Sequence, residues 1–242
     1  MSKNDTVIEI GPGRGALTEL IIAQAAHTHL IEFDRDLVEF WQNRAQGLDS
    51  LTVHGEDVLR FDLGEIIGSK QTDQSQGKLK IIGNLPYNIS SPVLFHLMHY
   101  ADQIDSQVVM LQKEVVERMA SGPGSKQYGR LSVMLQQLYS IENLFKVPPT
   151  AFFPPPKVDS AIARLTPLSQ VKHPVDSQLD FEKLVKQAFS MRRKTLRNTL
   201  KGLLDAEQIA SLNIDPGARA ETLSVEHFAA LTNLYSANST IA

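Results

Sequence analysis

The chain has 242 residues, no cysteine, and 24 basic against 27 acidic side chains. Without cysteine there is no disulfide framework and no thiolate metal site. The seven histidines are scattered, and His96 and His99, three apart, have no carboxylate partner nearby, so we expect no metal. No apolar run approaches the roughly 20 residues that cross a bilayer, and no secretory signal precedes the first strand pattern, so we expect a soluble, cytoplasmic monomer.

Charge is distributed unevenly along the chain. Residues 1–67 carry five basic and twelve acidic side chains, whereas residues 180–202 carry seven basic and two acidic ones. The two regions therefore suit ligands of different charge.

The first two thirds of the chain alternates strand and helix patterns. The expected strands are residues 6–10, 28–33, 51–54, 79–83, 107–111 and 158–165. The expected helices are residues 16–26, 35–46, 90–100 and 113–120, and the polar stretch 69–78 is expected to be a surface loop. This alternation is typical of an α/β fold with a doubly wound, Rossmann-like sheet.

Only helical patterns follow a linker at residues 166–177, with helix caps expected at Asp180, Asp205 and Ser224. We therefore expect two domains: residues 1–168 with the sheet, and a small all-helical domain at residues 178–242.

A glycine-rich turn, Gly11-Pro12-Gly13-Arg14-Gly15, lies between the first strand and the first helix. At this position of a doubly wound sheet the backbone approaches a nucleoside cofactor, and a side chain would collide with it. We therefore expect Gly11 and Gly13 to contact a cofactor. The turn alone is compatible with NAD, FAD, S-adenosylmethionine or a tight turn without a ligand.

Acidic residues after two later strands narrow this choice. Glu32 lies 21 positions after Gly11 and can accept hydrogen bonds from both ribose hydroxyls, which also fits NAD. Asp57 can accept the adenine amine of the cofactor, while the N–H of Val58 can reach a ring nitrogen. Because the first quarter is strongly acidic, it suits a cationic sulfonium better than a pyrophosphate, so we favour S-adenosylmethionine.

The stretch Asn84-Leu85-Pro86-Tyr87 follows the strand expected at residues 79–83. Pro86 stiffens the turn, so the Asn84 amide and the Leu85 carbonyl can face outward as acceptors beside the flat ring of Tyr87. Two acceptors and an aromatic face fit a planar exocyclic amine such as N6 of adenine, and we infer a nucleobase amine as the target. The alternative is that Asn84 caps the next helix and Tyr87 fills the core.

The basic side chains of residues 180–202 recur at helical spacings that gather several of them on one side. They are Lys183, Lys186, Arg192, Arg193, Lys194, Arg197 and Lys201. Such a face suits the phosphates of a folded RNA, and the alternative is a solvated helix surface.

Taken in order, these motifs resemble those of the ribosomal RNA adenine dimethyltransferase family, and within it the bacterial small-subunit branch. The resemblance runs from residue 7 to about residue 235. The matching segments are residues 9–13, Glu32, Asp57, and residues 83–90, 111–116, 128–133, 154–160 and 192–198.

The resemblance implies a class I methyltransferase sheet, S-adenosylmethionine as cofactor, and the RNA of an immature small ribosomal subunit as partner. The reaction it implies is N6,N6-dimethylation of two adjacent adenines in a hairpin near the 3′ end of that RNA. Gly11, Glu32, Asp57 and Asn84 would line the cofactor pocket, and residues 84–87 would hold the target amine.

Phe152 would then stack on the flipped base, because an adenine inside a helix cannot present N6 and an aromatic platform offsets lost stacking. The alternative for Phe152 is the core, and for Phe153 we expect the core.

One departure from the family concerns the start of the chain. Family members carry a helix and a basic Gly-Gln-Asn-Phe-Leu segment ahead of the first strand, whereas Met1 lies only a few residues before it here. We therefore expect weak cofactor binding or poor turnover. The rival functions are a large-subunit RNA adenine methyltransferase, a DNA adenine methyltransferase, and an RNA-binding ribosome-assembly factor with little activity.

Overall fold

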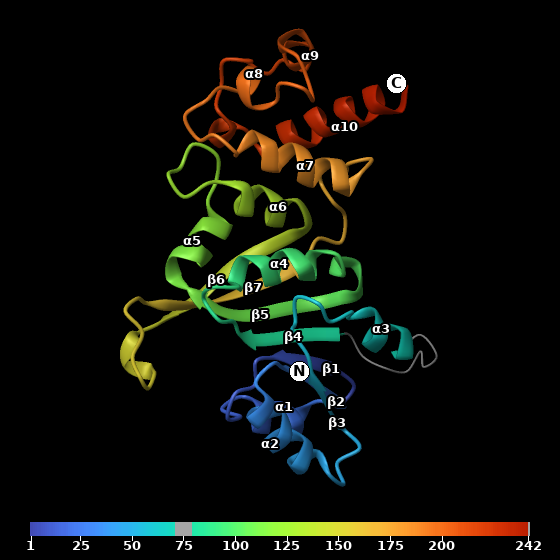
Figure 1. Cartoon of the computed structure of the whole chain (residues 1–242), viewed down its shortest axis with the longest axis vertical. Coiled ribbons are helices and arrows are strands. Elements are labelled where there is room, and N and C mark those ends of the chain that lie inside the picture. Colours follow the sequence, from blue (N-terminus) through green and yellow to red (C-terminus); the bar gives the residue numbers. More distant parts are fainter. Residues whose placement is uncertain (71–78, 242) are drawn as a thin grey trace. The chain divides into compact units, whose positions relative to one another are not determined.

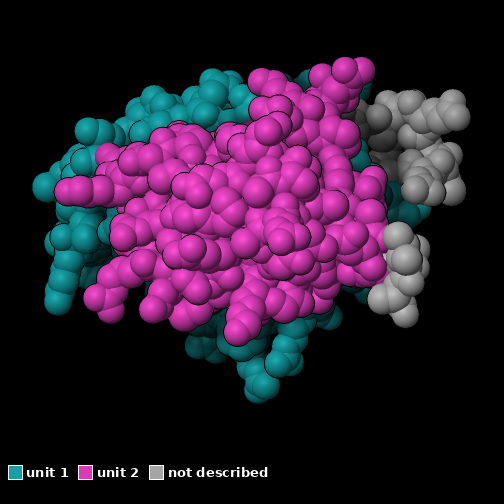
Figure 2. Space-filling view, turned by 90° about the horizontal axis from the view of Figure 1, so that it is seen from above, with its two compact units in different colours: residues 1–116, 140–167 teal, residues 117–139, 168–242 magenta. Residues whose placement is uncertain are grey.

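The structure is a computed structural model that describes residues 1–70 and 79–241. It contains two compact units, which Figure 2 shows in different colours: residues 1–116 with 140–167, and residues 117–139 with 168–242. Residues 117–139 thus group with the C-terminal helices, although the sequence placed them with residues 1–168. The division into domains at 1–168 and 178–242 stays a prediction.

The first unit is built on a seven-stranded sheet with the order β3-β2-β1-β4-β5-β7-β6 (Figure 1). The strands are β1 (Thr6–Ile10), β2 (His27–Glu32), β3 (Leu51–Gly55), β4 (Leu79–Asn84), β5 (Ile104–Gln112), β6 (Tyr139–Val147) and β7 (Ser160–Pro167). The pairs from β3 through β5 are parallel, and β7 runs antiparallel to β5. The doubly wound α/β fold is therefore confirmed, with an antiparallel edge added to a parallel sheet.

Helices α1 (Thr18–Gln24), α2 (Arg35–Ala45), α3 (Gly64–Lys70) and α4 (Ser90–Met98), with the short 3-10 helix η1 (Ala101–Gln103), connect the parallel strands. Helix α5 (Lys113–Ala120) follows β5, and the 3-10 helix η2 (Pro149–Ala151) lies between β6 and β7. All five residues of β1 are buried, as expected for a central parallel strand covered on both faces. Trp41 of α2 packs with Leu30 of β2 and Leu51 of β3. This packing fixes the helix that follows Glu32 against the sheet.

The second unit is helical. It contains α6 (Arg130–Leu138), α7 (Gln178–Ala188), α8 (Leu196–Thr199), α9 (Ala206–Ser211), the 3-10 helix η3 (Ala220–Thr222) and α10 (Val225–Ile241). Phe181 and Leu184 of α7 and Phe228 of α10 are fully buried and form part of its core. Helix α7 packs against both α6 and α10.

Several expectations about elements were wrong or incomplete. The cap of α7 is Ser177, whose side chain accepts from the N–H of Asp180, so Asp180 is not the cap. The expected caps at Asp205 and Ser224 are confirmed, since each side chain accepts from a backbone N–H of the following turn. Residues 71–78 of the expected loop lie outside the described part of the chain.

The sequence missed β6, α3 and α6. β6 is an edge strand with many exposed residues, so it lacks the alternation that identifies a half-buried strand. α3 spans only seven residues and contains two glycines, which leaves too short a pattern to recognise.

None of the described helices is long and apolar enough to cross a membrane.

Candidate functional site

A cavity of about 880 Å³ opens where β1 and β4 end. Its size lies within the range of roughly 300–1,000 Å³ that is typical of ligand pockets. The cavity is lined by the glycine turn and by residues of five strands. The lining residues are 9 of β1, 11–17 of the turn and the residues after it, 82–84 of β4, 108 and 110 of β5, 144, 145 and 147 of β6, 151 and 152, and 162 of β7. The structure therefore brings Gly11, Gly13, Asn84 and Phe152 together around one cavity.

The glycine turn needs its glycines because three of them adopt positive φ: Gly11 at +67°, Gly13 at +54° and Gly15 at +91°. A Cβ on Gly15 would also lie 2.7 Å from the Trp41 ring. Trp41 Nε1 in turn donates to the carbonyl of Gly13 at 2.9 Å. The turn is thus held from outside by a buried indole, and its backbone faces the cavity.

Glu32 lies at the end of β2 and is only 8% exposed. Its Oε2 accepts from the N–H of Gly13 at 3.3 Å, and its Oε1 accepts from the N–H groups of Phe33 and Asp34 at 2.9 and 3.0 Å. The carboxylate therefore ties the glycine turn to the end of the second strand.

A second cavity, of about 820 Å³, adjoins the ends of β2 and β3 and contains Asp57. Asp57 Oδ1 accepts from the N–H of Leu59 at 3.0 Å, which fixes the side chain in its turn. Phe33, which is 76% exposed, also lines this second cavity, and the sequence interpretation missed it. The side chain of Val58 is buried, and Val58 is not among the described residues that line either cavity.

Asn84 is the last residue of β4 and is exposed at the rim of the first cavity. Gly83 precedes it because a Cβ there would lie 3.0 Å from the carbonyl oxygen of Ile10. The N-cap of α4 is Ile89, without a side-chain cap bond, so Asn84 does not cap this helix. The Asn84 side chain forms no hydrogen bond within residues 1–70 and 79–241, and the residue is exposed.

The turn after Asn84 is fixed by its other polar groups. The N–H of Leu85 donates to the Met110 carbonyl at 3.2 Å, and Ser90 Oγ donates to the Pro86 carbonyl at 3.0 Å. The Tyr87 hydroxyl bonds to Ser160 Oγ, at the start of β7, at 2.7 Å. Tyr87 is half-buried, and Leu85, Pro86 and Tyr87 are not among the described lining residues, so they surround Asn84 without lining the cavity.

Three phenylalanines lie at or next to the cavity rim. Phe152 is half-buried and lines the cavity, as does Phe145 of β6, which is 60% exposed. The core position expected for Phe153 is wrong, because this side chain is fully exposed. The extended backbone at Phe152 explains the error, since neighbouring side chains in an extended segment point to opposite sides.

Glu9 is a candidate site residue that the sequence interpretation overlooked. It lines the first cavity, is 3% exposed, and its Oε2 has no hydrogen-bond partner among the described residues. Burial raises the pKa of its carboxyl to about 7. The signal in the sequence was an acidic residue in the middle of a central strand, where both faces are covered and the carboxyl must be buried.

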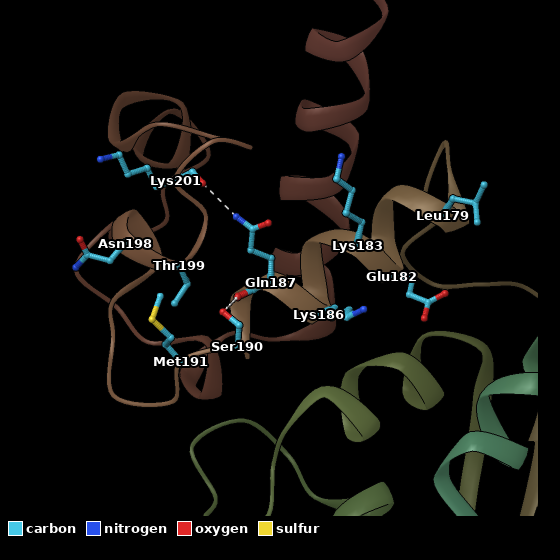
Figure 3. A pocket seen from close by; sticks show the side chains of 10 residues that line it. All are labelled: Leu179, Glu182, Lys183, Lys186, Gln187, Ser190, Met191, Asn198, Thr199 and Lys201. Carbon is cyan, nitrogen blue, oxygen red and sulfur yellow. Dashed lines mark hydrogen bonds between the residues drawn. The ribbon is translucent and has the colours of Figure 1, made fainter.

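The predicted basic helix face is not formed. α7 ends at Ala188, residues 189–195 make turns, and α8 has only four residues, so helical spacing does not apply across the segment. Lys183 and Lys186 line a hollow of about 670 Å³ in the second unit, together with Lys201. Their side chains point in different directions (Figure 3).

Two of the predicted RNA-binding side chains have partners inside the second unit. Lys183 Nζ donates to the Tyr235 hydroxyl, and this bond raises the pKa of the lysine. Arg192 donates from Nη2 to the Lys126 carbonyl at 2.7 Å, and its Nε lies 3.7 Å from Glu221.

Four other predicted RNA-binding side chains remain exposed: Lys186, Arg193, Lys194 and Arg197. In the part of the chain that the structure describes, none of the four forms an ion pair. Lys183, Arg192 and Lys201 are exposed as well, but Lys183 and Arg192 already bond to groups of the second unit. Among the described residues no group of three or more His, Asp or Glu side chains could hold a metal ion.

A family model described as ribosomal RNA adenine dimethylase matches residues 1–237 of the chain. A protein of Chromobacterium violaceum named ribosomal RNA small subunit methyltransferase A is 49% identical over 95% of this chain and 84% of its own length. A protein of the same name from Alcanivorax borkumensis is 47% identical over 97% of this chain and 81% of its own.

Two solved structures are similar over nearly the whole chain. A dimethyladenosine transferase from Plasmodium falciparum is 26% identical, with a TM-score of 0.74 over 96% of this chain and 90% of its own. The 23S rRNA methyltransferase ErmE is 22% identical, with a TM-score of 0.68 over 98% of this chain and 93% of its own, and this likeness shows the fold alone.

Proposed function

Because this chain belongs to the ribosomal RNA adenine dimethylase family, we propose that it dimethylates N6 of adenine in small-subunit ribosomal RNA with S-adenosylmethionine. The observation that carries the proposal is the exposed Asn84 amide at the rim of a cavity whose other walls are the glycine turn and Phe152. As the resemblance implies, the target is a pair of adjacent adenines in a hairpin near the 3′ end.

The cofactor is proposed to lie across both cavities of the first unit. The backbone of Gly11 and Gly13 would approach it closely, Glu32 would accept its ribose hydroxyls, and Asp57 would accept its adenine amine. Val58 is proposed to contribute only its backbone N–H, since its side chain is buried. The glycine turn supports a close approach, because Gly11 and Gly13 have positive φ and carry no side chain that would meet a ligand.

Glu9 supports a cationic ligand in the first cavity. A buried carboxylate oxygen without a partner is costly, and a cation in the same cavity would stabilise its charge. S-adenosylmethionine carries a sulfonium and an amino group, whereas a dinucleotide carries a pyrophosphate. The Glu9 carboxylate therefore fits the sulfonium cofactor better than a dinucleotide. When bound, S-adenosylmethionine supplies an electrophilic methyl group.

The target adenine is proposed to leave its helix and enter from the Phe152 side. Phe152 would stack on the ring, while the Asn84 side-chain oxygen and the Leu85 carbonyl would accept the two hydrogens of N6. Pro86 and Tyr87 would hold these acceptors in place, because the turn is bonded to Met110, Ser160 and Ser90. Positioning of this kind orients the N6 lone pair without a general base.

RNA outside the flipped base is proposed to contact the second unit through Lys186, Arg193, Lys194 and Arg197, whose charges are exposed. Lys183 and Arg192 would contribute less, because Tyr235 and the Lys126 carbonyl already occupy them.

Relatives at 47–49% identity carry a small-subunit name, which supports the small subunit over the large one as the source of substrate. The immature small subunit is accordingly the proposed partner. The reaction would form part of its maturation.

The test is transfer of labelled methyl groups from S-adenosylmethionine to unmodified small ribosomal subunits, followed by mapping of the modified nucleotides. We expect dimethylated adenines in one hairpin of the small-subunit RNA. Label in large-subunit RNA or in DNA would contradict the proposal. Tight RNA binding in a filter assay without any methyl transfer would indicate an assembly factor instead.

A further inference from the structure

Phe153 is a fully exposed aromatic residue directly beside a residue that lines the proposed active site. Single exposed apolar side chains are common on protein surfaces and carry no argument by themselves. Phe153 differs because of its position, since Phe152 faces the cavity and Phe153 follows it in extended backbone. The two rings therefore point to opposite sides of one short segment.

The segment that presents Phe153 is stiff. Pro148 and Pro149 precede it and Pro154, Pro155 and Pro156 follow it, so the backbone has few conformations to lose when a ligand binds. Folding does not account for an aromatic side chain here, because exposure leaves its apolar surface in water.

Two exposed cations lie close to these aromatic residues in the chain. Lys146 follows Phe145, which lines the cavity with 60% of its surface open, and Lys157 lies after the proline run that follows Phe153. Aromatic side chains interspersed with cations are the feature with which proteins bind single-stranded nucleic acid, since rings stack on bases and cations contact phosphates.

We infer that Phe153 stacks on a base of the substrate RNA that neighbours the flipped adenine, outside the cavity. This inference rests on the proposed function. When one adenine leaves the stack, its neighbour loses one stacking partner, and a fixed ring at the rim can replace it. Phe152 would then hold the reacting base and Phe153 the strand beside it, which keeps the gap in the helix open.

Steady-state methylation of a small-subunit RNA hairpin with three variants tests this role. Phe153→Ala should raise KM for RNA roughly tenfold, with kcat and the Kd for S-adenosylmethionine unchanged. Phe153→Tyr should retain the wild-type KM because it keeps a planar ring, whereas Phe153→Leu should behave like Phe153→Ala. Leu20→Ala on α1 is the matched control, since Leu20 is 60% exposed and apolar but lines neither cavity, and it should change nothing.

Fluorescence gives a second readout. With 2-aminopurine placed beside the target adenine, wild-type binding should quench the probe and Phe153→Ala should remove most of that quenching. An unchanged KM in Phe153→Ala would overturn the inference, and so would full rescue by Phe153→Leu, which would show apolar contact without stacking. An effect on whole subunits but not on the free hairpin would also overturn it, because Phe153 would then contact a ribosomal protein. Failure of the wild-type chain to methylate any RNA would instead count against the proposed function.

Discussion

The two units place their functional side chains by different means: the first at the ends of its parallel strands, the second along the basic segment of residues 183–201. In the sheet, the parallel ladder sets Glu9 beside Ile82 and Ile10 beside Gly83, so residues that end neighbouring strands meet at one edge. In residues 189–195 no repeating backbone exists, and each cation takes a position set by its own turn. Side chains at strand ends can therefore be placed from the order of strands, whereas cations on a turn cannot.

The two regions also differ in how far their polar groups are engaged. The turn after Asn84 bonds to two other strands and to its own helix, which leaves the Asn84 amide exposed on a fixed base. Arg193, Lys194 and Arg197 are exposed on turns and a four-residue helix. We expect single substitutions to have large effects in the first region and small, additive, salt-dependent effects in the second.

The largest expected effect is that of Asn84→Ala. Removing one of the two proposed acceptors should lower kcat about 100-fold or more, because the amine is no longer oriented. The Kd for S-adenosylmethionine should change much less, and isothermal titration would measure it. Leu20→Ala is the control for an exposed substitution in the same unit. Near-normal turnover of Asn84→Ala would contradict the proposed role.

Gly15→Ala tests the rigidity of the glycine turn. Positive φ and a 2.7 Å approach to Trp41 should together lower the free energy of unfolding by roughly 3 kcal/mol. Gly13→Ala is the matched variant, because it also has positive φ but meets no atom within 4 Å, and it should cost about 1 kcal/mol. Denaturant unfolding measures both, and equal losses would show that Trp41 gives way easily.

Glu9→Gln tests how the buried Glu9 carboxyl affects the pH dependence of stability and of cofactor binding. Because burial raises the folded-state pKa of Glu9 from 4.5 to about 7, the folded chain binds its proton more tightly than the unfolded chain. Stability should therefore fall as pH rises from about 4.5 to 7, by about 3 kcal/mol at most, and Glu9→Gln should remove this loss.

Cofactor affinity should change in the opposite direction with pH. In the wild type it should strengthen as Glu9 ionises across pH 7, and in Glu9→Gln it should be weaker, by about tenfold, and independent of pH. Calorimetry in buffers of different ionisation enthalpy should detect proton release on binding near pH 7. A variant with the wild-type pH profile would show that Glu9 does not face the ligand.

The smallest effect is expected in the basic segment. The double reversal Arg193→Glu with Arg197→Glu should weaken RNA binding and lower the slope of log K against log salt by about 1.5. The neutral pair Arg193→Gln with Arg197→Gln should weaken binding less. Cofactor binding should remain unchanged in both, and a parallel loss of cofactor and RNA binding would indicate misfolding. Arg192 is left intact because it bonds to Lys126 within the unit.

The sequence predicted the doubly wound sheet well because buried parallel strands carry strong apolar patterns. The family resemblance implied that Gly11 and Asn84 share one pocket, and the structure places both on one cavity. Their chemical roles, and those of Glu32 and Asp57, stay predictions.

Other features depended on tertiary contacts that local patterns do not contain. The pKa of Glu9 follows from burial by residues distant in the chain. Phe153 is exposed on the side of an extended segment opposite to Phe152, which lines the cavity. The basic residues 183–201 were expected to gather on one side by helical spacing, because spacing alone does not reveal that α7 ends at Ala188.

The hydrogen bond between Tyr87 and Ser160 connects two segments that the chain separates by 73 positions. Tyr87 belongs to the acceptor turn, and Ser160 begins the strand that leaves the proline segment bearing Phe152 and Phe153. A shift of either segment would therefore be transmitted to the other through one pair of hydroxyls. Recognition of the base ring by the Phe152 segment and alignment of its amine by the acceptor turn would then be mechanically coupled. A pyrimidine, too small to contact both segments at once, would leave the acceptor turn unaligned.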